Sequence, residues 1–276
     1  IVSTISTINH MNKFIPMSCS KYILSLIFCL IALMSQAKVI YVNGSNTGGT
    51  QDGSKWENSY IDIATAFNAA FDGDELWIAK GVYQIKSDGN VNPSLALDKS
   101  ISFYGGFDGN EKLLSDRNWE TYSTIFKGNS DIRFCYFLTD NNTIVLDGIS
   151  FEDFGTIQTP NEDGGSNIMI LKNSVLKNNN HVMSMGGSAS EYYFDNLKII
   201  NSGGITSNGY ALSVLEFKNS ILNEESFLVM EASDISIENV SITNSITHGL
   251  ILRGNGYCSI KNVNLNESLL ILNGGF

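Results

Sequence analysis

The side chains that could do acid–base chemistry in this chain recur at one position of a segment repeated about every 23 residues. Three of these side chains are acidic and three are basic: Asp147, Asp195, Glu238, Lys172, Lys218 and Lys261. A polysaccharide lyase would need acidic residues that hold calcium beside an Arg or Lys base, and a hydrolase would need clustered carboxylates. The alternating signs favour a solvated ladder of ion pairs between repeats, each worth about 0–1 kcal/mol.

Other polar residues give equally little indication of a site. Asp72, Asp74 and Glu75 could bind Ca²⁺, although a turn between a helix and a strand explains them without a metal. His181 follows three asparagines and is typical of a surface turn, and residues 161–165 hold only two acids. The chain has no HExxH, CxxC, phosphate-binding glycine loop or Gly-x-Ser-x-Gly motif. We therefore assign no catalytic, cofactor-binding or metal residue, and expect no cofactor, with Ca²⁺ as the open alternative.

The elements that must position these side chains are visible as an internal repeat. Six segments share one anchor position, which holds glycine in the first and asparagine in the others: Gly148, Asn173, Asn196, Asn219, Asn239 and Asn262. The anchors are 25, 23, 23, 20 and 23 residues apart. A second polar position lies five residues after each anchor: Asp153, Asn178, Asn201, Glu224, Asn244 and Glu267.

Apolar and polar residues alternate within each segment, as in a strand with one buried face. Asn tolerates left-handed backbone, so it suits a sharp bend, and stacked Asn side chains can bond amide to amide. A further strand keeps the same interval in residues 227–230, 250–252 and 269–272. The pattern predicts an all-β fold, a parallel β-helix with one coil per repeat. A leucine-rich repeat would need a leucine consensus that is absent, and a β-sandwich would need the spacing to be coincidental.

The part of the chain before the repeats has a different pattern. Residues 39–42 and 75–79 predict strands, and residues 60–71 predict an amphipathic helix that ends with Gly73 at its C-terminal cap. The open end of a β-helix exposes apolar interior and unpaired strand edges, so this helix is expected to cap the first coil. We divide the chain into residues 1–37, a cap with the first coils over 38–128, and coils over 129–276.

Two stretches within residues 39–128 carry a family resemblance. The first combines Tyr41, Val42 and Trp56 with residues 73–83 (GDELWIAKGVY). The second combines residues 101–109 (ISFYGGFDG) with Glu111, Arg117, Trp119 and residues 124–128 (TIFKG). Together they resemble the entry into pectin-lyase-like right-handed β-helices, of the secreted or surface-exposed bacterial type with polymorphic outer-membrane-protein-like repeats. The resemblance implies a right-handed, single-stranded parallel β-helix and a C-terminal anchor or secretion domain, but no particular activity.

One short stretch resembles an enzyme of this fold. His248, Gly249 and Arg253 are faintly similar to the His-Gly and Arg elements of polygalacturonases. The clustered Asp motifs of that family are absent, so we assign these residues no catalytic role.

The composition and the start of the chain indicate export. The chain has 276 residues, 43% of them hydrophobic, a net charge of −11 and 31 asparagines. From Met11 it resembles a secretory signal, with Lys13 and Lys21, an apolar run over 23–34 and a cleavage site after Ala37. Its removal takes away two lysines and no acid, which leaves 15 basic and 28 acidic residues, a net charge of −13. Such acidity argues against a nucleic-acid partner.

These observations lead to two functional expectations. The first is a secreted or outer-membrane cell-surface β-helix, a non-enzymatic adhesin, stalk or glycan-contacting protein without a transmembrane helix after signal cleavage. Its partners would be polysaccharides or host or cell-surface ligands. The alternative is a polysaccharide lyase or glycoside hydrolase whose site lies in missing coils or in loops such as residues 155–167. We expect further coils after Phe276, which falls within a repeat.

The stacking order predicts two free, mostly buried thiols in the mature chain. Cys135 and Cys258 are 123 residues apart, which is about five coils. At about 4.8 Å per coil the two residues lie roughly 24 Å apart along the axis, whereas a disulfide needs Cα atoms within about 7 Å. Non-reducing peptide mass spectrometry should find both thiols free, and a Cys135–Cys258 crosslink would refute the stacking order.

Overall fold

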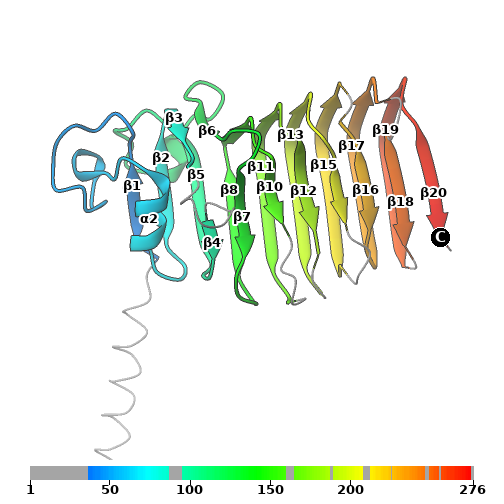
Figure 1. Ribbon diagram of the computed structural model, residues 1–276, viewed down its shortest axis with the longest axis horizontal. Helices are drawn as coiled ribbons and strands as arrows, with labels where there is room; N and C mark the ends of the chain where they lie inside the picture. The colour runs from blue at the N-terminus through cyan, green and yellow to red at the C-terminus, as the bar shows by residue number, and fades with distance from the viewer. Residues whose placement is uncertain are drawn as a thin grey trace, which may run out of the picture. The chain divides into compact units, whose positions relative to one another are not determined.

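The alternating segments form parallel strands that stack coil upon coil (Figure 1). The computed structural model describes residues 37–86, 95–159, 165–186, 189–207, 212–224, 226–245, 249–254 and 256–274. Residues 38–276 form a compact unit of their own. The expected secretory signal, residues 11–37, lies outside the described residues except for Ala37.

Two sheets run the length of this unit. The larger sheet has 12 strands: β1 (Val39–Val42), β2 (Glu75–Ala79), β3 (Gly81–Gln84), β5 (Ile101–Phe107), β6 (Thr124–Lys127), β8 (Thr143–Asp147), β9 (Ile149–Glu152), β11 (Ile168–Lys177), β13 (Glu191–Ile200), β15 (Val214–Asn223), β17 (Asp234–Thr243) and β19 (Tyr257–Asn266). The smaller sheet has eight: β4 (Leu95–Leu97), β7 (Arg133–Phe137), β10 (Thr156–Thr159), β12 (His181–Met185), β14 (Ile205–Ser207), β16 (Leu228–Glu231), β18 (Leu250–Gly254) and β20 (Leu270–Gly274).

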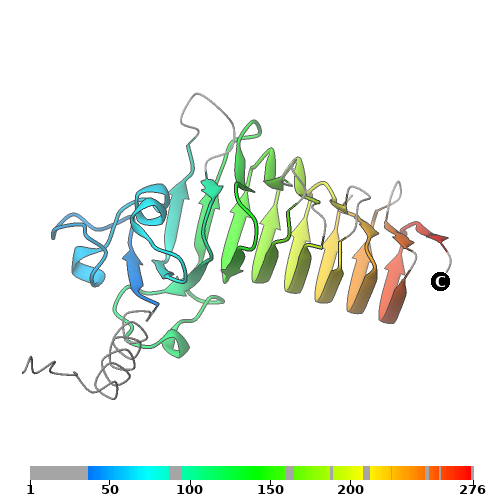
Figure 2. The ribbon, with the colours of Figure 1, turned by 90° about the horizontal axis from the view of Figure 1, so that it is seen from below.

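The strand register confirms the predicted fold class. The first repeat adds two strands, β8 and β9, to the larger sheet, and each later repeat adds one strand to each sheet. Equivalent strands of successive coils pair in parallel, as Figure 2 shows from below. The predicted third strand keeps its register, because Met230 pairs with Leu252 and Leu252 with Leu272. The chain is therefore an all-β protein whose parallel sheets form a β-solenoid.

The predicted bends are where the backbone turns left-handed. All six anchors and all six second polar positions have φ between 44° and 74°. At Gly148 the bend separates β8 from β9, but at the later anchors it does not end the strand: β11, β13, β15, β17 and β19 each run for ten residues through their anchor. In β11, β13, β15 and β17, buried and outward side chains alternate on both sides of the bend, so both halves of these strands face one core.

The anchor side chains form the predicted amide ladder, in two runs. Each Nδ2 donates to the preceding coil, at 3.0 Å from Asn262 to Asn239, 2.9 Å from Asn239 to Asn219 and 2.9 Å from Asn196 to Asn173. Each run ends on a carboxylate rather than an amide. Asn219 donates to Asp195 at 2.7 Å, and Asn173 donates to Asp147 at 2.8 Å.

A second polar row lies just inside the second bend, and sequence reasoning missed it. Its side chains accept hydrogen bonds from backbone N–H groups of the preceding coil: Asn179 from Phe154, Ser202 from Asn179, Ser226 from Ser202 and Ser268 from Ser245. These bonds satisfy backbone donors that would otherwise be buried without a partner. The sequence signal is a Ser or Asn one or two residues after the second bend.

The N-terminal helix packs on the first coil, but it is shorter than predicted. Helix α2 (Ile63–Ala69) begins at its cap Asp62, which accepts a hydrogen bond from the Thr65 N–H at 2.8 Å. It cannot start at Tyr60, because Tyr60 forms a parallel bridge with Val42. The prediction that Gly73 caps the helix was also wrong, since the helix ends at Ala69 with Ala70 as its C-cap, and Gly73 lies in the following turn.

The helix nevertheless buries the predicted face. Ile63, Phe67 and Ala70 belong to the continuous core, and the Phe67 ring stacks on Phe103 with 6.1 Å between ring centroids. Two short 3₁₀ turns, η1 (Trp56–Asn58) and η2 (Leu114–Asp116), lie in the loops of this part.

Both cysteines of the described residues are free, as predicted. Cys135 is buried in β7, where burial raises the pKa of its thiol. Cys258 in β19 is only half-buried, which departs from the expectation of two mostly buried thiols. Cys258 pairs in register with Ile235 of β17, and its own strand β19 is the last described strand of the larger sheet, so no described strand pairs with its other edge.

Asn239 tests the contribution of the ladder to stability, since it both donates and accepts in the amide row. Asn239→Ala loses two hydrogen bonds and places Ala in left-handed backbone, so we expect the free energy of unfolding to fall by about 2–3 kcal/mol. Asn239→Gly loses the same bonds without the steric conflict, so its loss in the free energy of unfolding should be about 1 kcal/mol smaller.

The measurement is a chemical denaturation series followed by circular dichroism. Ser241→Ala, on the outside of the same strand, is the matched control and should change stability by less than about 0.5 kcal/mol. Equal losses for Asn239→Ala and Asn239→Gly would show that left-handed backbone is not the source of the effect.

Candidate functional site on the outer face of the large sheet

The six charged residues of the repeat lie next to one another across the coils, as the sequence predicts. In register, each acid of the column has a lysine of the next coil beside it: Asp147, Lys172, Asp195, Lys218, Glu238 and Lys261. The ion pairs only partly follow this order. Lys172 lies 3.3 Å from Asp147, whereas Lys218 pairs at 2.7 Å with Glu216 of its own strand. The Lys218–Glu216 hydrogen bond raises the pKa of Lys218.

Asp147 departs from the solvated ladder. Its side chain is 2% exposed, and its Oδ2 lies 2.6 Å from Nη2 of Arg117. Arg117 also donates through Nη1 to the carbonyls of Gly105 and Asp147, and its guanidinium lies 5.2 Å from the Tyr104 ring centroid. The interpretation of Asp147 as a solvated residue was therefore wrong, because a loop outside the repeat covers it.

The same loop explains the glycine at the first anchor. Gly148 has φ of 74°, and a Cβ there would lie 2.8 Å from Cβ of Trp119 and 3.0 Å from Nη1 of Arg117. The later coils lack this loop and carry Asn at the anchor. Arg117 and Trp119, which the sequence marks only through the family resemblance, thus act as a clamp on the first repeat.

The carboxylates considered for Ca²⁺ each accept hydrogen bonds from N–H groups of the protein. Asp74, which is 5% exposed, accepts hydrogen bonds from the backbone N–H groups of Lys38 and Phe71, both at 2.9 Å. Asp72 accepts from the Ser100 N–H, and Glu75 accepts from the Trp77 indole at 2.8 Å. Within the described ranges, no three His, Cys, Asp or Glu side chains gather as metal ligands. These residues therefore do not fit a calcium ion.

The other residues that the sequence analysis considered as possible site residues do not form a cluster among the described residues. His248 lies outside the described residues, and so do residues 161–164. Arg253 is exposed in β18, in register with Glu231. His181 starts β12 rather than forming a turn, with Nε2 3.1 Å from the Thr206 hydroxyl, and its half-buried position lowers its pKa.

An open groove of about 600 Å³ lies on strands β13, β15, β17 and β19. Its lining residues come from the first halves of these strands: Tyr193, Val214, Leu215, Glu216, Asp234, Ile235, Ser236 and Tyr257. Two rows of outward side chains cross it, one joining Tyr193, Glu216 and Ser236 and the other joining Val214, Asp234 and Tyr257. The groove thus combines aromatic rings with hydrogen-bond acceptors on a rigid surface.

Hydrogen bonds fix two side chains of the groove region. The Tyr193 hydroxyl donates to the Glu191 carboxylate at 2.7 Å, and this bond, together with burial and nearby negative charge, raises the pKa of Tyr193 to about 12. Glu216 is held by Lys218. Sequence reasoning did not single out Tyr193 or Tyr257, although strand alternation places both outward; their proximity depends on stacking four strands.

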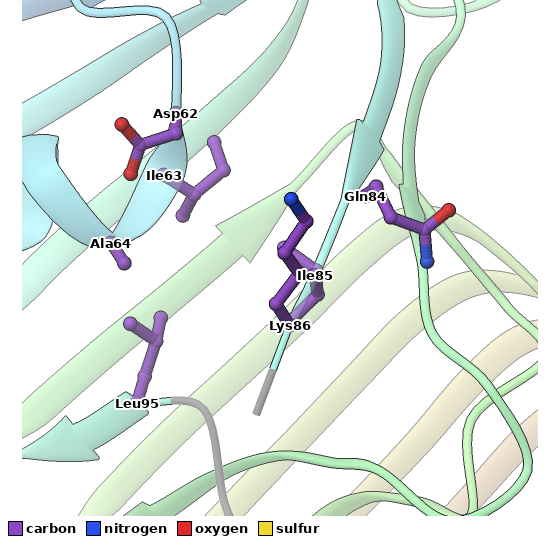
Figure 3. Close-up of a pocket in the computed structure, with 7 residues that line it drawn as sticks. All are labelled: Asp62, Ile63, Ala64, Gln84, Ile85, Lys86 and Leu95. Carbon is purple, nitrogen blue, oxygen red and sulfur yellow. The ribbon is translucent and has the colours of Figure 1, made fainter. Parts of the chain in front are cut away.

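A second pocket, of about 320 Å³, lies beside the start of α2 (Figure 3). Its lining comes from α2 and its cap, from the end of β3 and beyond, and from β4: Asp62, Ile63, Ala64, Gln84, Ile85, Lys86 and Leu95. Lys86 and Leu95 flank residues 87–94, which lie outside the described residues. We assign no function to this pocket.

The fold thus defines a parallel β-solenoid with a capped first coil and a shallow polar-aromatic groove on its large sheet. Comparison with family models, with curated proteins and with solved structures finds no match to the chain. The pectin-lyase-like relationship therefore has no support beyond the resemblance of residues 39–128. Over the described part of the chain, no helix has the length and apolar character needed to cross a membrane.

The Arg117 clamp can be tested by its contribution to stability. Arg117→Ala leaves the carboxylate of Asp147 buried without its closest charged partner, so we expect a loss of about 3 kcal/mol in the free energy of unfolding. The control is Lys127→Ala, which breaks the half-exposed Lys127–Asp153 pair and should cost about 0–1 kcal/mol. Denaturant titration followed by tryptophan fluorescence measures both. Similar losses for the two variants would contradict a buried clamp.

Proposed function

We propose that this chain is part of a secreted or cell-surface protein that contacts glycans or other surface ligands without transforming them. The observation that carries the proposal is the regular outer face of the large sheet, where side chains of successive coils form straight columns across β11 to β19. Such a surface offers a long, repetitive contact area, whereas enzyme sites are usually concave and enclosed. The groove on β13 to β19 is open and lies within this surface.

The bonding of the acidic residues supports a non-enzymatic role. A hydrolase needs two carboxylates that face one substrate bond, with one free to act as acid or base. Asp147 is instead held by Arg117, Asp74 by two backbone N–H groups, and Glu111 by the N–H groups of residues 108–110. Their hydrogen bonds hold loops and turns of residues 38–147 in place.

The location outside the cell rests on the sequence. The signal-like pattern over residues 11–37 and the resemblance of residues 39–128 to secreted and surface-exposed bacterial β-helices both favour export. A rigid solenoid stabilised by packing, without disulfides among its described residues, suits a stalk that projects a binding surface.

The proposal predicts retention without turnover. The purified chain is incubated with acidic and neutral polysaccharides, with and without Ca²⁺, and the bound fraction, unsaturated products and reducing ends are measured. We expect binding to at least one polysaccharide and no release of product. Release of unsaturated sugars would instead support a lyase, and release of reducing ends alone would support a hydrolase; either result would overturn the non-enzymatic function.

A further inference from the structure

The groove on β13, β15, β17 and β19 has an aromatic ring at each end. Tyr193 lies on β13 and Tyr257 on β19, three coils further along the axis, which is about 14 Å at the spacing of paired strands. Tyr257 is 70% exposed, and the hydroxyl of Tyr193 is fixed by Glu191. A tyrosine offers an apolar ring face and a polar tip, so this pair can hold an elongated ligand that has both apolar and hydroxyl-bearing surfaces.

Between the rings, hydrogen-bond acceptors lie beside the apolar residues Val214, Leu215 and Ile235. Glu216 and Ser236 are neighbours in register on β15 and β17, and Asp234 lies exposed beside Val214. Ionised carboxylates only accept hydrogen bonds, and bonds to a charged acceptor are stronger than bonds between neutral groups. These acceptors therefore suit a ligand rich in hydroxyl donors.

The charge of the groove selects among such ligands. The lining contains Glu216 and Asp234 and no basic residue, and the chain as a whole has a net charge of −11. A ligand with carboxylate or phosphate groups would be repelled. The carboxylates of this region attract a cationic peptide only weakly, because two of them already have partners. Glu216 forms an ion pair with Lys218 at 2.7 Å, and Glu191 accepts a hydrogen bond from the Tyr193 hydroxyl.

We infer that this groove binds a neutral glycan, with its sugar rings on Tyr193 and Tyr257 and its hydroxyl groups donating to Glu216 and Asp234. The inference rests on the proposed function and narrows it from glycans in general to an uncharged class. It also assigns the contact to the first halves of the bent strands, away from the charged column nearer the bend.

The test is isothermal titration of the purified full chain with neutral glucan, mannan and galactan oligosaccharides, and with polygalacturonate and an oligolysine peptide as charged probes. We expect at least one neutral oligosaccharide to bind with an affinity that changes little between low and high salt. Tyr193→Ala and Tyr257→Ala should each weaken that affinity roughly two- to tenfold. Tyr257→Phe keeps the ring and should retain most of the affinity.

Tyr136→Ala is the matched control, because Tyr136 is a half-buried tyrosine on β7 of the other sheet. It should leave binding unchanged, and circular dichroism should show that every variant stays folded. Failure of all neutral oligosaccharides to bind would overturn the inference, as would binding that is unaffected by both tyrosine variants. Salt-sensitive binding of oligolysine alone would overturn it in favour of a cationic partner.

The same samples separate this inference from the proposed function. Binding of polygalacturonate that the tyrosine variants do not weaken, without binding of any neutral oligosaccharide, would refute the groove and leave a glycan-contacting solenoid in place. Release of reducing ends or unsaturated sugars from a bound glycan would refute the non-enzymatic function even if the tyrosine variants behave as expected.

Discussion

The structure depends on one constraint, which is that the backbone must turn left-handed at the same two places in every coil. Only glycine and a few residues with short polar side chains adopt that conformation at low cost. Glycine, asparagine or aspartate fills ten of these twelve positions, and Glu224 and Glu267 fill the other two. The chain turns at both positions and stays extended between them, and the nearly fixed period brings equivalent strands into register. The parallel sheets, the shared core and the outer columns then follow from stacking identical turns.

The amide row along the anchor positions is not continuous over all six repeats. At the first repeat a non-repeating loop takes the place of the amide row, so Arg117 and Trp119 lie where Asn lies in later coils. Within the later coils the amide row is broken once, where Asn219 donates to Asp195 instead of Asn196.

The local features were predictable from the sequence because they arise from single residues at a fixed period. The bends, the strand alternation and the register of Met230 with Leu252 all follow from residue type and spacing. The helix start was not predictable, since the bridge between Tyr60 and Val42 joins segments far apart in sequence. The burial of Asp147 and the groove between Tyr193 and Tyr257 likewise depend on long-range neighbours, which no local pattern encodes.

The amide ladder has a direction, and this gives the solenoid an electrical polarity. Every described Asn-to-Asn bond points its N–H toward the preceding coil, so the side-chain dipoles of a run align head to tail. Aligned dipoles polarise one another and build up partial positive charge at the end where the N–H groups emerge. Asp147 and Asp195 lie at those ends and supply the compensating negative charge. An acidic residue at the end of an amide row thus stabilises the aligned amide dipoles, much as an acidic residue at the start of a helix stabilises the helix dipole.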